Sequence, residues 1–197
     1  MVFHAPEGVH LHAAERSGEG APVLFLHGWA TTSRIWRPVF ERWQGAEQLV
    51  ALDQRGVGFS AKPASAEAYR LDTFTADALS VIDALGGRVR LVGHSMGGLI
   101  AQRVATQRQA AVERLVLVSP VPAGGLPLPD EDVAYFKRLA GTRAGMETVL
   151  GSMMARPVDA EVMRAFVDDA SSVLPTQFKA ALDMWRGASF ADELGGI

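Results

Sequence analysis

The sequence changes from a strand-like to a helix-like pattern within nine residues, Arg90-Leu91-Val92-Gly93-His94-Ser95-Met96-Gly97-Gly98. Its first part is apolar, as at the end of a buried strand, and apolar residues then recur at steps of three and four as far as Val104. Ser95 lies between these two parts, with Gly93 and Gly97 two residues away on either side. Glycine permits the sharp turn and close backbone approach that this arrangement requires. We therefore expect the Ser95 hydroxyl to project from the carboxyl end of a sheet, beside the N–H groups that open a helix.

Composition indicates a globular chain. It has 197 residues, 48% of them hydrophobic and 21% charged, which suffices for one domain with a real core. The net charge of -3 provides no electrostatic case for binding nucleic acid. The absence of cysteine excludes disulfides, thiol catalysis and cysteine-ligated metals. No run approaches the ~20 apolar residues of a membrane span, and residues 1–6 lack the pattern of a signal peptide, so we expect a cytoplasmic protein with neither a membrane nor a nucleic-acid partner.

Strand and helix patterns alternate along residues 1–120. Continuous apolar runs, typical of strands buried on both faces, occupy residues 23–26, 49–52 and 115–118. Helical patterns lie between the strands, at residues 35–43, 72–85 (with Asp72 as N-cap) and 96–107. This alternation predicts an α/β fold with a mostly parallel, doubly wound sheet that binds ligands at the carboxyl ends of its strands. Near the N-terminus, we expect an edge strand at residues 9–14 and a hairpin turn at residues 17–20.

The pattern changes after Pro120. A proline- and glycine-rich linker leads into four helical segments with no strand between them, at residues 130–140, 142–155, 159–170 and 175–186. Asp130 and Asp159 are candidate N-caps, and Pro175 suits a first helical position. We expect a core at residues 1–120, a helical cap at residues 121–190 over the carboxyl edge of the sheet, and the start of an incomplete return to the core at residues 191–197. The apolar stripes of the cap helices are typical of packing, although methionines facing a cleft would also suit an adaptable apolar pocket.

Two patterns resemble binding motifs but lack the context that those motifs need. His10 and His12 would share a strand face and could join His4 at a metal, but no carboxylate or cysteine completes the ligand set. Gly56 and Gly58 begin a formal dinucleotide fingerprint, but the residues that follow do not continue a helix. We therefore expect neither a metal nor a cofactor.

Three ordered motifs, each after a predicted strand, resemble the α/β-hydrolase superfamily: His27-Gly28-Trp29, Asp53-Gln54-Arg55-Gly56-Val57-Gly58-Phe59-Ser60 and Gly93-His94-Ser95-Met96-Gly97-Gly98. The resemblance implies that Ser95 is a nucleophile and that the backbone N–H groups of Trp29 and Met96 form an oxyanion hole. It implies that His27 braces its loop and is not the base. Gly28, Gly93, His94 and Gly97 would shape the site, with the His94 side chain pointing away from the serine hydroxyl.

The sequence departs from the family pattern at the catalytic base. The family takes its histidine from a position after the last strand and orients it with an acid, but no histidine follows His94 here. Asp130 and Glu131 could be a displaced acid, although they resemble a helix start. We expect the last two core strands, the catalytic histidine and the acid to be absent, and residues 116–118 to form an exposed apolar edge. A second polypeptide or a C-terminal segment would then complete the sheet, and this chain alone would have little esterase activity.

The first functional hypothesis is a serine hydrolase that cleaves a small-molecule substrate, a carboxylic ester or lactone, through an acyl-enzyme on Ser95. A carbon–carbon bond hydrolase, a cofactor-free haloperoxidase or perhydrolase, and an acyltransferase are alternatives within the fold. Epoxide hydrolases and haloalkane dehalogenases of this fold use an aspartate at the elbow, so Ser95 argues against both. A non-catalytic small-molecule-binding protein is the alternative from another class; it would explain the missing histidine but not the intact elbow.

Overall fold

The computed structural model describes residues 1–196, and six strands within that part of the chain form one sheet. The strands are β1 (Val2–His4), β2 (His10–Arg16), β3 (Gly20–Leu26), β4 (Glu47–Leu52), β5 (Val89–His94) and β6 (Val112–Val118). The α-helices are α1 (Arg37–Arg42), α2 (Leu71–Ala84), α3 (Met96–Gln107), α4 (Asp130–Leu139), α5 (Arg143–Ser152), α6 (Ala160–Ser171) and α7 (Pro175–Arg186). Short 3-10 helices are η1 (Pro6–Gly8), η2 (Ser33–Trp36), η3 (Ala66–Tyr69), η4 (Gln109–Ala111) and η5 (Ala191–Gly196).

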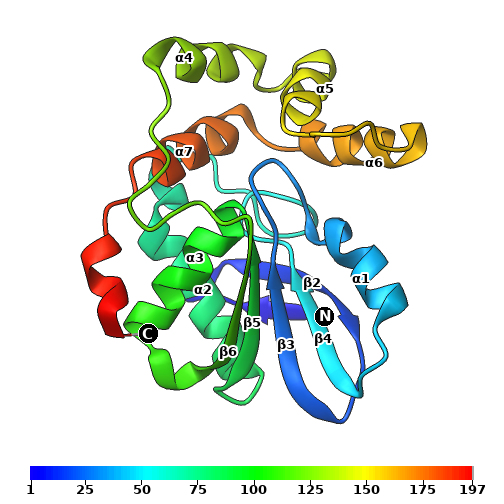
Figure 1. The fold of residues 1–197 in the computed structure, drawn as a ribbon, viewed down its shortest axis with the longest axis vertical. Coiled ribbons are helices and arrows are strands. Elements are labelled where there is room, and N and C mark those ends of the chain that lie inside the picture. Colours follow the sequence, from blue (N-terminus) through cyan, green and yellow to red (C-terminus); the bar gives the residue numbers. More distant parts are fainter. Residues whose placement is uncertain (197) are drawn as a thin grey trace.

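The sheet has the order β1-β2-β4-β3-β5-β6 (Figure 1). The pairs β3–β4, β3–β5 and β5–β6 are parallel, whereas β1–β2 and β2–β4 are antiparallel. The predicted mostly parallel sheet is therefore confirmed. Its parallel strands end on one side, and this places the loops after β3, β5 and β6 next to one another.

The N-terminal prediction was wrong in two respects. Residues 17–20 do not form a hairpin turn between paired strands, because β2 pairs with β4, and β4 separates β2 from β3. The edge strand on this side is β1, which pairs with β2. The physical reason is burial: the apolar residues of β3 and β4 are covered on both faces, so these strands take interior positions, while the half-polar β2 lies further out.

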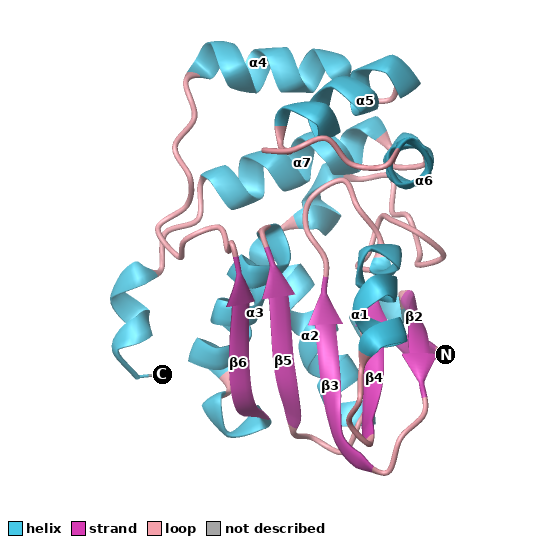
Figure 2. Cartoon of the chain, turned by 45° about the vertical axis from the view of Figure 1, so that its right-hand side comes forward, coloured by secondary structure: helices cyan, strands magenta, loops and turns pink. Residues whose placement is uncertain are grey.

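Helices cover both faces of the sheet (Figures 1 and 2). On the face covered by α1, the ring of Phe25 lies 5.1 Å from that of Trp36 and 5.3 Å from that of Phe40, measured between centroids. On the other face, Leu91 of β5 belongs to the same buried cluster as Ile82 of α2 and Leu99 of α3. The sheet is thus packed between two apolar layers, and this fixes the ends of its strands.

Helix starts follow the sequence signals in part. Asp159 caps α6 by accepting a hydrogen bond from the backbone N–H of Glu161, and Pro175 occupies the first turn of α7, as predicted. Asp72 and Asp130 are not N-caps. Each lies inside the first turn of its helix, where its negative charge interacts favourably with the positive end of the helix dipole. The expected helix at residues 35–43 is divided into η2 and α1, and Pro38 lies in the first turn of α1.

Helices α4 to α7 lie beyond the carboxyl ends of the parallel strands (Figure 2), and η5 returns alongside α3. Strand β6 forms the other edge of the sheet, and Val116, Leu117 and Val118 are 49%, 37% and 41% exposed, so the expected apolar edge is confirmed. The predicted domain bounds remain a prediction, and residue 197 lies outside the described part.

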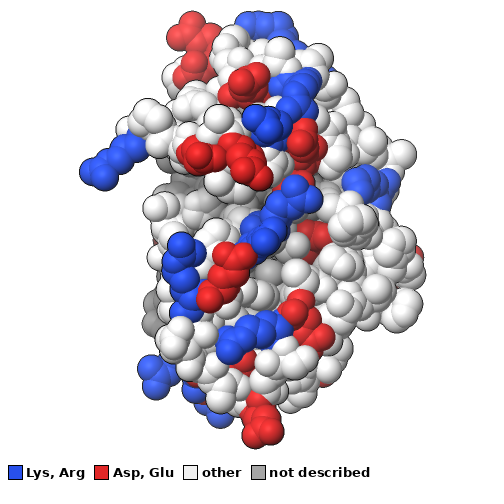
Figure 3. Space-filling view, turned by 90° about the vertical axis from the view of Figure 1, so that its right-hand side faces the viewer, with Lys and Arg blue, Asp and Glu red and all other residues white. Residues whose placement is uncertain are grey.

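No helix within residues 1–196 combines the length and apolarity needed to cross a membrane. On the face seen in Figure 3, acidic and basic side chains are interspersed.

Candidate active site

Ser95 occupies a strained turn between β5 and α3. Its backbone has φ 53° and ψ -119°, in the left-handed half of the dihedral map that side-chain-bearing residues rarely adopt. Hydrogen bonds hold this conformation on both sides: the Ser95 N–H donates to the Val118 carbonyl at 3.1 Å, and the Ser95 carbonyl accepts from the N–H of Val121 at 3.0 Å. Ser119, beside these partners, also has a positive φ of 42°. The two strained serines lie next to each other at the ends of β5 and β6.

Glycines allow the chain to close around Ser95. A Cβ at Gly97 would lie 2.4 Å from the Leu26 carbonyl oxygen, so only glycine lets α3 approach the end of β3 this closely. A Cβ at Gly28 would lie 3.1 Å from the Cβ of Ser95 and 3.0 Å from Nδ1 of His94. The loop after β3 therefore passes directly against the elbow.

Two backbone N–H groups beside the elbow have no protein acceptor within residues 1–196, those of Trp29 and Met96. Met96 is the first residue of α3, where the helix dipole favours negative charge. The Trp29 side chain is 5% exposed, and its indole N–H donates to the Phe178 carbonyl of α7 at 2.9 Å. The resemblance implies that these two N–H groups are the donors of an oxyanion hole.

Both ring nitrogens of His27 are engaged in its own loop. Nε2 accepts a hydrogen bond from the backbone N–H of Gln54 at 3.1 Å, so Nδ1 carries the proton and donates to the Gly28 carbonyl at 2.8 Å. The Gln54 side-chain amide donates in return to the His27 carbonyl at 2.7 Å. Burial lowers the pKa of His27, which keeps the ring neutral. His27 thus ties the loop after β3 to the loop after β4.

His94 lies beside the elbow but makes no hydrogen bond with Ser95. Its Nδ1 is buried without a partner among residues 1–196, and burial lowers the pKa of the ring. Within that range, the Ser95 hydroxyl has no side-chain partner at all within hydrogen-bonding distance. The described residues therefore place a serine and two N–H donors together, but not a base.

The remaining candidate side chains lie elsewhere. His4 lies opposite His10 in the pairing of β1 with β2, and Nδ1 of His12 lies 2.9 Å from Oδ2 of Asp53. Over residues 1–196, no three histidine, aspartate or glutamate side chains converge as metal ligands. Asp130 pairs with Arg186 at 3.1 Å and, like Glu131, does not line the cavity beside Ser95, so the structure does not bring either acid to the serine.

A cavity of about 600 Å³ opens beside Ser95. The loops after β3 and β6 contribute Trp29 and Ser119, and helices α5, α6 and α7 contribute Leu150, Phe166 and Trp185. Ser119 and Phe166 were not among the residues predicted for the site. The Ser-Pro pair after a predicted strand could have indicated Ser119, whereas no local pattern indicates which cap residue faces the core.

A second cavity, of about 800 Å³, lies on the other side of Trp36 and is more polar. Here the hydroxyl of Thr32 donates to Oδ2 of Asp169 on α6 at 2.8 Å, and Arg34 lies 3.2 Å from the other oxygen of the same carboxylate. Asp53 accepts from the backbone N–H of Ser33 at 2.8 Å. Burial alone would raise the pKa of Asp53, but the hydrogen bond from Ser33 and the charge on nearby groups hold that pKa below its ordinary value. This cluster fastens a cap helix to the loop that carries Trp29.

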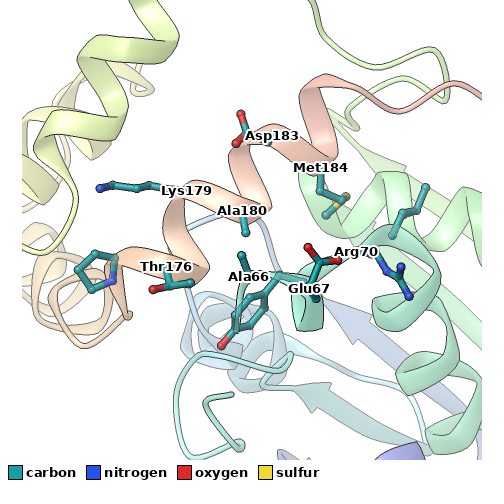
Figure 4. Close-up of a pocket in the computed structure, with 11 residues that line it drawn as sticks. Ala66, Glu67, Arg70, Thr176, Lys179, Ala180, Asp183 and Met184 are labelled. Carbon is teal, nitrogen blue, oxygen red and sulfur yellow. The ribbon is translucent and has the colours of Figure 1, made fainter. Parts of the chain in front are cut away.

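A third hollow lies between η3 and α7, where Figure 4 shows Ala180 pointing toward Ala66. Its charged residues include Glu67, Arg70 and Lys179. None of the residues that line it also lines the cavity beside Ser95. It therefore lies outside the candidate site.

Comparison with known proteins agrees with this geometry. The family model for the alpha/beta hydrolase fold matches residues 21–150. Epoxide hydrolase 4 of Mus musculus is 33% identical over 114 residues, which are 57% of this chain and 32% of that protein. A pimeloyl-[acyl-carrier protein] methyl ester esterase of Legionella pneumophila is 30% identical over 114 residues, 58% of this chain and 43% of that protein. The chain thus spans about a third to two fifths of these relatives.

Solved structures show the same fold. An esterase from Exiguobacterium antarcticum superposes with a TM-score of 0.89 at 22% identity, covering 100% of this chain and 77% of that one. A bromoperoxidase from Bacillus anthracis superposes with a TM-score of 0.86 at 21% identity, covering 98% of this chain and 76% of that one. The strained serine, the ordered motifs and the family match lead to one conclusion: the chain belongs to the α/β-hydrolase family.

Proposed function

We propose that the protein is a serine hydrolase that cleaves a carboxylic ester or lactone through an acyl-enzyme on Ser95. The observation that carries the proposal is the backbone of Ser95, which is held at φ 53° beside the N–H groups of Trp29 and Met96, neither of which has an acceptor among residues 1–196. Strain of this kind persists only where the surroundings over-determine it, and it places a hydroxyl where an oxyanion can be stabilised.

In the proposed reaction, Oγ of Ser95 attacks the carbonyl carbon and gives its proton to a base. The carbonyl oxygen becomes negative and is stabilised by the N–H groups of Trp29 and Met96, each worth on the order of 3 kcal/mol of barrier. The ester C–O bond then breaks and the alcohol leaves with a proton. Water attacks the acyl-enzyme by the same steps and releases the acid and the free serine.

The base in this proposal is a histidine outside residues 1–196. His27 is engaged at both nitrogens, and His94 does not bond Ser95. A C-terminal segment or a second polypeptide that pairs with the free edge of β6 would supply it. Two observations support this placement: the exposed apolar residues of β6, and its position next to the turn that holds Ser95. The mass of every chain in a purified active sample distinguishes the two sources.

Ester hydrolysis is favoured over epoxide hydrolysis despite the similarity to epoxide hydrolases. Opening of an epoxide ring through a covalent alkyl-enzyme needs a carboxylate at the turn between β5 and α3. The residue at that turn here is a serine. The other serine-nucleophile reactions of the fold use the same Ser95 chemistry and differ in the bond that breaks or in the acceptor of the acyl group. A non-catalytic binding protein is the second candidate, because the Ser95 hydroxyl lacks a base among the described residues while a cavity lies beside it. A cytoplasmic location is part of the proposal.

Hydrolysis of a series of 4-nitrophenyl esters tests the proposal, with the protein purified together with the segment or polypeptide that supplies the base, and with its Ser95→Ala variant prepared in the same way. We expect turnover by the parent protein, and loss of at least about a thousandfold in kcat/KM by the variant. Turnover that survives in Ser95→Ala would exclude Ser95 as the nucleophile. A folded protein that turns over no ester in the series would favour the binding protein.

A further inference from the structure

The cavity beside Ser95 is lined by apolar side chains from both the core and the cap. Ile35 and Val39 lie on the core side, and Leu150, Met153 and Phe166 lie on the cap side. Within residues 1–196, no aspartate, glutamate, lysine or arginine lines this cavity. Its one titratable side chain is His94, and burial lowers the pKa of that ring. Residues 1–196 therefore offer no opposite charge to a ligand in this cavity.

Charged groups that line the neighbouring cavity are already paired with one another or with backbone groups. Arg34 lies 3.2 Å from Oδ1 of Asp169, and Asp53 accepts from His12 and from the backbone of Ser33. These contacts lie on the far side of Trp36, the side chain that the two cavities share. None of these groups is available to balance a charge brought next to Ser95.

The polar groups that line the cavity carry no full charge. They include the hydroxyls of Thr31, Ser95 and Ser119 and the ring of His94. The indole N–H groups of Trp36 and Trp185 also lie at the lining and have no hydrogen-bond partner among residues 1–196. A single ester group uses such donors, whereas a carboxylate or phosphate would lose its hydration without gaining a cation. The volume of about 600 Å³ also exceeds what a methyl acetate-sized ester would fill.

We infer that the substrate is an uncharged ester or lactone with a bulky apolar group, and that esters carrying a carboxylate or phosphate are excluded. The inference rests on the proposed function, because it names the substrate class of the same site. The cavity should also bind neutral esters in preference to charged ones, and this binding preference can be measured without turnover.

The test separates binding from turnover. The Ser95→Ala variant of the protein removes the nucleophile and leaves the cavity lining in place. Trp29, Trp36 and Trp185 line the cavity, and they are three of the four tryptophans in the chain, so quenching of their fluorescence reports occupancy. The probes are propyl 4-methylbenzoate and the monopropyl ester of terephthalic acid. The first carries a methyl group at the ring position where the second carries a carboxylate. We expect the neutral ester to bind roughly 100-fold more tightly.

A positive charge introduced at the entrance of the cavity tests whether the preference for the neutral ester arises in this cavity. Met153 lines the cavity and is 51% exposed, so Met153→Lys brings a cation to the entrance without burying it. In the Ser95→Ala background, this change should lower the ratio of the affinity for the neutral ester to the affinity for the carboxylate-bearing ester by about fivefold. Val162→Lys is the matched control: the residue is 44% exposed on the same cap and does not line the cavity, so the ratio should stay unchanged. Thermal unfolding followed by circular dichroism establishes that each variant is folded.

Three results would overturn the inference: affinities for the two probes within about threefold of each other, no saturable binding of the neutral ester, or equal effects of lysine at positions 153 and 162. The proposed function fails separately, when the protein purified with the segment or polypeptide that supplies the base forms no adduct on Ser95 with a phosphonate. Selective binding without that adduct would describe a protein that binds uncharged apolar ligands. An adduct without selective binding would leave a hydrolase with a different substrate class.

Discussion

The indole N–H of Trp29 donates a 2.9 Å hydrogen bond to the backbone carbonyl of Phe178, a residue 149 positions further along the chain. The two rings also pack with centroids 4.1 Å apart, and Trp185 meets Trp29 edge-on at 5.7 Å. Trp29 is the residue whose backbone N–H we propose as an oxyanion donor. Its side chain is therefore held by α7, so Trp29 connects this helix to the proposed oxyanion hole.

Replacing Trp29 tests this connection. Trp29→Phe keeps an aromatic ring but removes the indole N–H, so we expect it to lower the free energy of unfolding by about 1 kcal/mol beyond the effect of lost ring area. Trp185→Phe is the matched control, because the Trp185 indole N–H is buried without a hydrogen-bond partner among residues 1–196. Urea unfolding of both variants gives the difference. Equal losses would mean that the bond to Phe178 contributes nothing.

The approach of α3 to β3 depends on a missing side chain. Gly97→Ala would put a Cβ 2.4 Å from the Leu26 carbonyl oxygen, a rigid backbone atom, and should destabilise the protein by about 1–3 kcal/mol. Gly151→Ala meets nothing within 4 Å and lies in α5, where alanine is the better helix former, so it should be neutral or slightly stabilising. Melting temperatures of the two variants check the contrast, and a stable Gly97→Ala protein would contradict the close packing described here.

The contact between Thr32 and Asp169 joins the cap to the loop that carries Trp29. A double-mutant cycle with Thr32→Val and Asp169→Ala should give a coupling free energy of about 1 kcal/mol, because both side chains are largely buried. Arg143 and Asp168, an exposed pair involving the neighbouring residue of α6, are the control and should couple by less than about 0.5 kcal/mol. Similar coupling in both cycles would show that the Thr32 contact is no stronger than a surface ion pair.

Acid should destabilise the protein through His27. The folded chain keeps this buried ring neutral, while the unfolded chain takes up a proton near the ordinary pKa of 6.5. The stability that depends on neutral His27 is therefore present above pH 6.5 and is lost as the pH falls below it, by at most about 1.4 kcal/mol one pH unit lower. Urea unfolding at about pH 7.5 and about pH 5.5 measures this loss.

The His27→Gln variant isolates the contribution of this residue, and its stability should fall less between the two pH values than that of the parent protein. It should keep part of the dependence, because burial also lowers the pKa of His94. His10→Gln, at an exposed position of β2, should keep the full dependence. An unchanged dependence in His27→Gln would contradict the account of that residue.

Local sequence signals predicted the elements near Ser95 well, because their causes are local. Residues 93–98 indicated a sharp turn, and it is found where β5 meets α3. The pairing of β2 with β4 was not predictable, because alternating residues indicate a half-buried strand but not its neighbour. The same limit applies to the cap: helical periodicity shows which face of α6 is apolar, but only the tertiary fold brings Phe166 into the cavity and Asp169 to Thr32.

The most direct test of the central claim starts from the protein purified with the segment or polypeptide that supplies the base. The sample is treated with a fluorophosphonate, and the adduct is mapped by peptide mass spectrometry. The account predicts one modified serine, Ser95, with no adduct in Ser95→Ala. Ser119→Ala, a change at the neighbouring strained serine, should still be labelled at Ser95. A folded protein that takes no adduct at Ser95, or takes it on another residue at the same rate, would contradict the proposal that Ser95 is the nucleophile.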